Sequence, residues 1–138
     1  MICAGQIIRQ RRSLLACDGR TSIPAQAFYR MLERVMPRAE RPVAERPVPW
    51  DAIPWAPAMH LGLFVHRVDG VEPGLYALAR DEAKLDKLKA AMHARFSWDR
   101  PPGCPAALPL FLLERGDARV LAMQLSCRQD IAGDGAFS

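Results

Sequence analysis

The longest proline-rich stretch in the chain constrains its fold more than any other feature. Five prolines fall within sixteen residues, and the same stretch holds Trp50 and Trp55; the prolines are Pro42, Pro47, Pro49, Pro54 and Pro57. Proline has a fixed φ and no backbone N–H, so this density excludes a helix or a central strand. A plain linker is one interpretation of residues 37–58. We favour an ordered surface loop, because two tryptophan side chains are costly to leave in water.

Periodic apolar residues before and after this loop predict regular structure. Residues 23–36 have helical spacing, with an entrance at 21–23 where Ile23 and Phe28 form a hydrophobic staple, and Pro37 ends the helix. After the loop, 60–68 and 75–79 are strand candidates joined by the Asp69-Gly70 turn. A helix is expected to begin at Asp81 and to bury a stripe of four residues: Leu85, Leu88, Met92 and Phe96. A short apolar strand at 108–113 and a helix over 118–132 follow. Residues 6–17 are predicted to form a short helix followed by extended chain.

This order of elements predicts a mixed domain, α+β or α/β. The 138 residues provide one hydrophobic core, so we predict a single domain over residues 1–138. No apolar run is long enough to cross a bilayer, and the first ten residues lack the apolar block of a signal peptide. We therefore expect a cytoplasmic protein that does not bind membranes.

The charge is unevenly distributed. Nineteen Lys and Arg residues stand against fifteen Asp and Glu, and the first 46 residues hold nine arginines against four acidic residues. A basic first third suits an anionic ligand, a nucleic acid or an acidic partner, although an arginine-rich codon usage explains the excess equally well. No pattern of a nucleic-acid-binding module is present, so we expect no nucleic-acid partner.

Several common sites have no counterpart in the sequence. Neither nucleotide-binding glycine loop occurs, nor does a nucleophile elbow, and the three histidines and four cysteines lack the spacing of metal ligands. We expect no metal and reduced thiols. One cluster suits chemistry: Arg11, Arg12 and Ser13 offer two guanidinium forks and a hydroxyl, which together can hold a phosphate. A solvated face is the alternative for such a short motif in an arginine-rich chain.

The context of this cluster resembles a known family. Residues 7–13 (IIRQRRS), followed by Cys-Asp-Gly-Arg at 17–20 and an amphipathic helix, are similar to the opening of the FMN-dependent nitroreductases. Residues 68–76 (VDGVEPGLY) resemble the hairpin of the branch that forms thiazole and oxazole rings in peptides. Residues 126–132 (SCRQDIA) resemble a helix that precedes the flavin-covering region. Where the family has a second basic residue and an aromatic one, this chain has Leu15 and Cys17.

The resemblance implies a fold, a cofactor and a reaction. It implies an α+β fold in which helices flank a mixed nitroreductase-like sheet, in an incomplete domain that a partner completes in a homodimer. Arg11, Arg12 and Ser13 would contact the phosphate and ribityl chain of FMN, and no protein residue would act as a nucleophile. The flavin would take hydride from NAD(P)H and reduce a small-molecule or peptide acceptor. The alternative is a truncated, non-catalytic relative that serves as a binding or dimerisation module, which Leu15 and the early stop favour.

Overall fold

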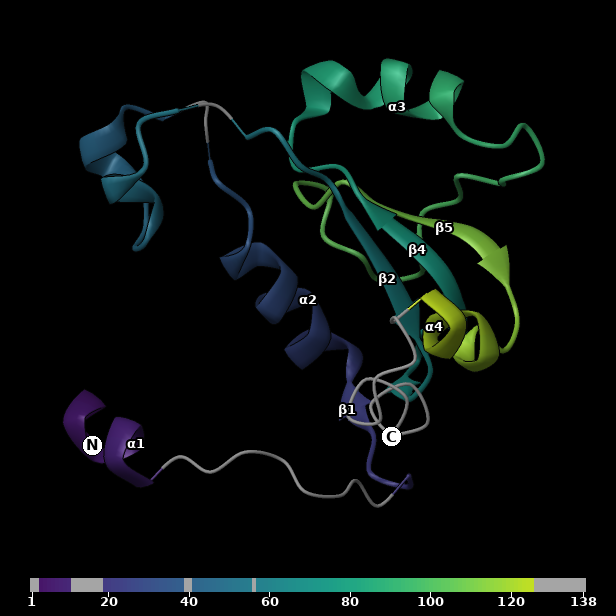
Figure 1. Ribbon diagram of the computed structural model, residues 1–138, viewed down its shortest axis with the longest axis horizontal. Helices are drawn as coiled ribbons and strands as arrows, with labels where there is room; N and C mark the ends of the chain where they lie inside the picture. Colours follow the sequence, from purple (N-terminus) through teal and green to yellow (C-terminus); the bar gives the residue numbers. More distant parts are fainter. Residues whose placement is uncertain (1–2, 11–18, 39–40, 56, 126–138) are drawn as a thin grey trace.

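A computed structural model describes residues 3–10, 19–38, 41–55 and 57–125 of the chain. It has the mixed α+β architecture that the sequence predicts, with four helices, a parallel sheet and an antiparallel sheet in the described part. In Figure 1, helices α2 (Ala25–Arg34) and α3 (Leu85–Ala91) lie on different sides of the larger sheet. None of the helices in the described ranges is both long and apolar enough to span a bilayer.

The larger sheet is antiparallel and has the order β2-β4-β5, from Leu61–Val65, Gly74–Leu78 and Leu110–Arg115. Leu61 pairs with Leu78 and Val65 with Gly74, so the predicted hairpin is confirmed. Strand β4 lies in the centre, and the side chains of Tyr76 and Leu78 are completely buried. The strand predicted at 108–113 is confirmed as β5 but lies two residues later; its first four residues are apolar and buried, whereas Glu114 and Arg115 are exposed.

The smaller sheet joins the start of α2 to the hairpin. Strand β1 (Ile23–Pro24) runs parallel to β3 (Val68–Asp69), and the Ile23 amide donates to the Arg67 carbonyl at 3.2 Å. This pairing fixes the direction in which the chain enters α2. The sequence analysis did not predict β1, because a two-residue parallel pair has no period of its own.

Helix α2 supplies one wall of the hydrophobic core. Its buried side chains are Phe28, Tyr29 and Leu32, and the Tyr29 hydroxyl donates to the Pro102 carbonyl at 2.9 Å. They pack with the sheet residues that point to this side, among them Tyr76, Leu78, Leu110 and Leu112. The predicted helix over 23–36 is therefore confirmed in its core and is shorter than predicted by two residues at each end.

The proline-rich segment forms two short 3-10 turns, Val43–Glu45 and Trp50–Ala52. Trp50 is half-buried: its Nε1 donates to the Arg34 carbonyl at 3.1 Å, and the Arg80 guanidinium lies 5.0 Å from its ring centroid. Trp55, by contrast, is 69% exposed, so the argument that both tryptophans need burial is wrong for this residue. The prolines, and not the two indoles together, set the course of this loop.

The helix after β4 is shorter than predicted. A 3-10 turn (Glu82–Lys84), which the Asp81 side chain caps at the Ala83 amide, leads into α3, which ends at Ala91. The four residues of the expected stripe are half-buried, but none is fully buried, and Met92 and Phe96 lie beyond the end of the helix. Beyond it, the amides of Ser97 and Asp99 donate to the carbonyls of Leu113 and Leu112 on the free edge of β5. The backbone of Ser97 and Asp99 therefore bonds to the edge of β5 and does not form the helical hydrogen bonds that the apolar periodicity predicted for this segment.

The two remaining helices lie near the chain ends. Helix α1 (Ala4–Gln10) buries none of its residues, and Figure 1 shows it apart from the sheet. Helix α4 (Arg119–Leu125) follows β5 after a turn at Gly116, and Ala122 is its buried residue. The predicted helix over 118–132 is confirmed up to Leu125, and its remainder lies outside the described residues.

Candidate functional site

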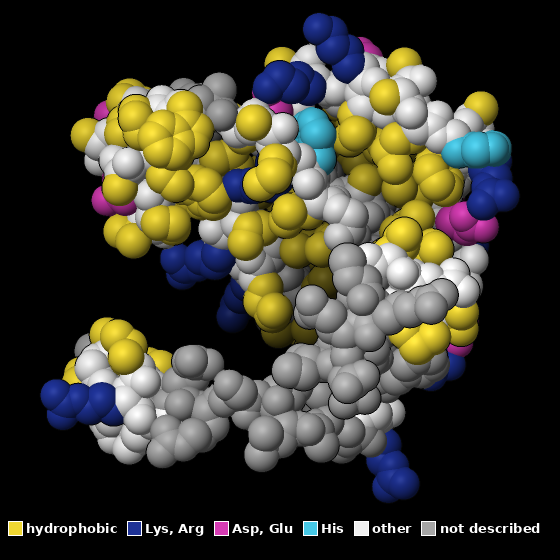
Figure 2. All heavy atoms as spheres, viewed as in Figure 1, with side chains coloured by type: hydrophobic (Ala, Val, Ile, Leu, Met, Phe, Trp, Pro, Cys, Tyr) yellow, Lys and Arg dark blue, Asp and Glu magenta, His cyan; other side chains and the backbone are white. Residues whose placement is uncertain are grey.

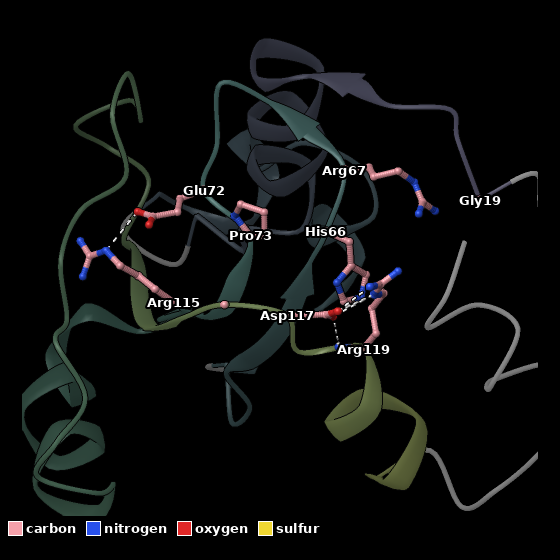
Figure 3. A pocket seen from close by; sticks show the side chains of 9 residues that line it. Gly19, His66, Arg67, Glu72, Pro73, Arg115, Asp117 and Arg119 are labelled. Carbon is pink, nitrogen blue, oxygen red and sulfur yellow. Dashed lines mark hydrogen bonds and ion pairs between the residues drawn. The ribbon is translucent and has the colours of Figure 1, made fainter.

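A cavity opens where the hairpin turn meets the connection between β5 and α4. Its volume is about 680 Å³, within the range of about 300–1,000 Å³ that is typical of small-molecule sites. Nine residues line it: Gly19, His66, Arg67, Glu72, Pro73, Arg115, Gly116, Asp117 and Arg119. Figure 3 shows two charged groups around Pro73, with Glu72 and Arg115 on one side and His66, Asp117 and Arg119 on the other.

Local hydrogen bonds hold the hairpin side of the cavity in place. The Tyr76 hydroxyl donates to the Glu72 carbonyl at 2.6 Å, and the Gly116 amide donates to the Pro73 carbonyl at 3.0 Å. Gly116 adopts a φ of 125°, in the left-handed region that favours glycine. Together these bonds tie the β3–β4 turn to the end of β5, which brings residues from four separate segments to one cavity.

Arg115 carries two carboxylate partners. Its Nε lies 3.0 Å from a Glu72 oxygen and its NH2 lies 3.1 Å from an Asp99 oxygen. The hydrogen bonds to Asp99 and Glu72 raise the pKa of the Arg115 guanidinium above its usual value. These exposed pairs orient the guanidinium more than they stabilise the fold, because solvent screens them.

Asp117 and Arg119 form the second ion pair. The Arg119 Nε contacts both Asp117 oxygens, at 2.8 and 2.9 Å, and the Arg119 amide donates to the same carboxylate at 3.0 Å. These hydrogen bonds hold the pKa of the Asp117 carboxyl well below its ordinary value. The carboxylate therefore stays ionised and fixes the guanidinium at the cavity wall.

His66 lies beside the ion pair of Asp117 and Arg119 (Figure 3). Burial is the main cause that lowers the pKa of its imidazole, and the positive charges of Arg119 and Arg67 lower it further. The negative charge of Asp117 acts in the opposite direction and raises this pKa. The imidazole is therefore neutral at neutral pH and offers one donor and one acceptor to a ligand.

The lining supports binding better than nucleophilic chemistry. Three arginines line the cavity, Arg67, Arg115 and Arg119, and none of the described lining residues carries a hydroxyl or a thiol. In the described ranges, no group of three or more His, Cys, Asp or Glu side chains is arranged to hold a metal ion. Cys3 and Cys104 are free thiols, and Cys17 and Cys127 lie outside the described residues. Guanidinium forks in a cavity of this size suit an anionic or phosphate-bearing ligand.

The site residues named from the sequence, Arg11, Arg12 and Ser13, lie outside the described residues. Gly19, which lines the cavity, follows Ser13 by six positions in the sequence. The sequence analysis missed Arg67, Arg115 and Arg119 as site residues. Each of these arginines lies within two or three residues of a turn that the sequence predicts, at Asp69-Gly70 or at Gly116-Asp117. The sequence alone does not show that the two turns lie close together in the fold.

No family model, no curated protein and no solved structure matches this chain.

Proposed function

We propose that the protein is an FMN-dependent oxidoreductase of nitroreductase type, which transfers hydride from NAD(P)H through the flavin to a small-molecule or peptide acceptor. One observation supports this function. The cavity is lined both by Gly19, from the Cys-Asp-Gly-Arg segment that follows the Arg-Arg-Ser stretch in the sequence, and by Glu72 and Pro73 of the hairpin that resembles the family. Two segments that carry the resemblance and are far apart in the sequence therefore contribute residues to one cavity.

The phosphate end of FMN suits the arginines of this region. A phosphate dianion takes charge-assisted hydrogen bonds from guanidinium groups, and three arginines line the cavity, of which Arg115 and Arg119 already pair with carboxylates. In this proposal Arg11, Arg12 and Ser13 bind the phosphate and ribityl chain, and Arg67 and Arg119 add positive charge at the same wall. Neutral His66 remains available as a hydrogen-bond partner for a polar group of the ligand.

Bound FMN would supply the redox chemistry, because its isoalloxazine ring accepts and donates hydride. The protein then needs only to bind and orient the flavin and its substrate and to shield them from water. Lining residues without a hydroxyl or thiol are sufficient for that role.

A homodimer is part of the proposal. Helix α4 exposes apolar side chains, with Val120 at 52% and Leu125 at 65% exposure. Leaving these side chains in water forgoes apolar burial that a second copy would supply. Sedimentation velocity is expected to give the mass of two chains.

The experiment titrates the purified protein with FMN and follows the quenching of flavin fluorescence and the visible spectrum. Arg12→Ala is expected to weaken binding by about 1.5–3 kcal/mol, because a charged hydrogen bond is lost. Lys87→Ala, at an exposed position of α3, is the matched control and is expected to bind FMN as the wild type does. A protein that takes up no added FMN, and is therefore colourless once the unbound flavin is removed, would instead support the non-catalytic binding or dimerisation module.

A further inference from the structure

A second basic cavity lies on the other side of α2, away from the hairpin turn. Its volume is about 550 Å³, and five arginines line it: Arg30, Arg34, Arg38, Arg41 and Arg46. We call this cavity the arginine groove. Figure 2 shows Lys and Arg side chains along the flank of α2 that faces away from the sheet.

The charge of the arginine groove is mostly uncompensated. Among the described residues of its lining, Glu33 and Glu45 are acidic, so five positive charges stand against two negative ones there; Glu40 lies outside the described residues. Counting only the described residues, the side chains of Arg30, Arg34, Arg38 and Arg41 have no ion-pair partner. Five of the nine arginines in the first 46 residues therefore line one cavity.

The helix itself gains little from this arrangement. Arg30 and Arg34 are four residues apart, so their like charges face each other on one side of α2 and destabilise it slightly. A cation near the helix C-terminus is favourable, which accounts for Arg34 but not for the other cations of the groove. The backbone carbonyls of Arg34 and Val35 already accept bonds from Trp50 and Arg80.

Two arginines of the groove have a defined conformation, one through side-chain hydrogen bonds and one through its backbone. Arg46 donates from Nε to the Arg41 carbonyl at 3.0 Å and from NH1 to the Ile53 carbonyl at 3.2 Å. Arg38 has a φ of 50°, which a residue other than glycine rarely adopts. Strained backbone of this kind gathers at functional sites.

We propose that the arginine groove is a binding site for a diphosphate group, as found in inorganic pyrophosphate and in nucleoside diphosphates. In the described lining, five guanidiniums against two carboxylates leave an excess of three positive charges, and a diphosphate carries about three negative charges at neutral pH. A single carboxylate or orthophosphate neutralises less of this excess. Guanidinium forks bind phosphate oxygens in pairs, and the cavity has the volume of a small-molecule site. The site does not depend on flavin binding.

The test measures binding of inorganic pyrophosphate by isothermal titration calorimetry in dilute buffer, with ADP and orthophosphate as further probes. Pyrophosphate is expected to bind about tenfold or more tightly than orthophosphate, because it meets more of the guanidiniums. If ADP binds as pyrophosphate does, the diphosphate alone is recognised. If ADP binds more tightly, the nucleoside contributes as well, and both results support the site.

The double variant Arg30→Gln/Arg34→Gln removes two exposed charges that make no side-chain hydrogen bond within the described residues. It is expected to weaken pyrophosphate binding by about a hundredfold, at about tenfold per charged contact. Arg95→Gln removes an exposed arginine outside the groove and is expected to leave the affinity unchanged. Equal loss in Arg95→Gln, unchanged affinity in the double variant, or binding only to long polyanions such as heparin would each overturn the proposal. Circular dichroism of both variants establishes that they are folded.

Discussion

The close approach of two strands at Gly74 gives the sharpest test of the fold. Gly74 is buried at the start of β4, in the hairpin that shapes the larger cavity. A Cβ at this position would lie 2.3 Å from the Glu114 carbonyl oxygen and 3.0 Å from the Leu112 Cδ1 atom. The first of these is a backbone atom of β5, so the contact cannot be relieved by a side-chain rotation.

Gly74→Ala is therefore expected to force β4 and β5 apart. Overpacking of this kind costs about 1–3 kcal/mol, and a clash with backbone belongs at the upper end of that range. The lower chain entropy of unfolded alanine offsets about 0.4–1 kcal/mol, which leaves a net loss of about 1–2 kcal/mol. For a domain of this size, that loss lowers the melting temperature by about 3–8 °C.

Gly62→Ala is the matched control for this substitution. Gly62 lies in β2 of the same sheet, is exposed, and has no atom within 4 Å of an added Cβ. Alanine there is expected to leave the free energy of unfolding unchanged or to raise it by up to about 1 kcal/mol. Urea denaturation followed by circular dichroism measures both variants. If Gly74→Ala were as stable as wild type, or no less stable than Gly62→Ala, the tight packing of β4 on β5 would be refuted.

Two further predictions concern the cavity wall. Tyr76→Phe removes the hydroxyl that donates to the Glu72 carbonyl at 2.6 Å. Because this hydrogen bond is buried, its loss is expected to lower the free energy of unfolding, measured by urea denaturation, by about 1–2 kcal/mol; an unchanged free energy of unfolding would contradict the bond. Burial lowers the pKa of His66, so the unfolded chain binds a proton that the folded chain resists, and stability falls as the pH drops below about 6.5. His66→Asn is expected to lose less stability than wild type between about pH 7 and pH 5.5, and an equal loss in both proteins would show that His66 does not titrate in this way.

Sequence reasoning predicted the elements whose cause is local. The apolar stripe of α2 and the turn at Asp69-Gly70 each depend on residues that are close in the sequence, so the helix and the hairpin were predictable. The end of α3 was not, because it depends on hydrogen bonds from Ser97 to the distant edge of β5. The cavity was missed for the same reason, since Arg67 and Arg115 are brought together only by the sheet.

The two basic cavities differ in how their charge is balanced, and this difference bears on both proposals. In the larger cavity, Arg115 and Arg119 already have carboxylate partners, so Arg67, Arg115 and Arg119 together leave little net positive charge for a ligand. A flavin phosphate bound there would need further cations, which Arg11 and Arg12 would supply.

For this reason the loss of Arg12 alone is expected to weaken FMN binding substantially, because the partners already present cannot compensate for it. The arginine groove has its excess charge in its own lining and needs no such addition. A diphosphate should therefore bind the groove whether or not flavin is present, and an Arg12→Ala variant that loses FMN should keep its affinity for pyrophosphate.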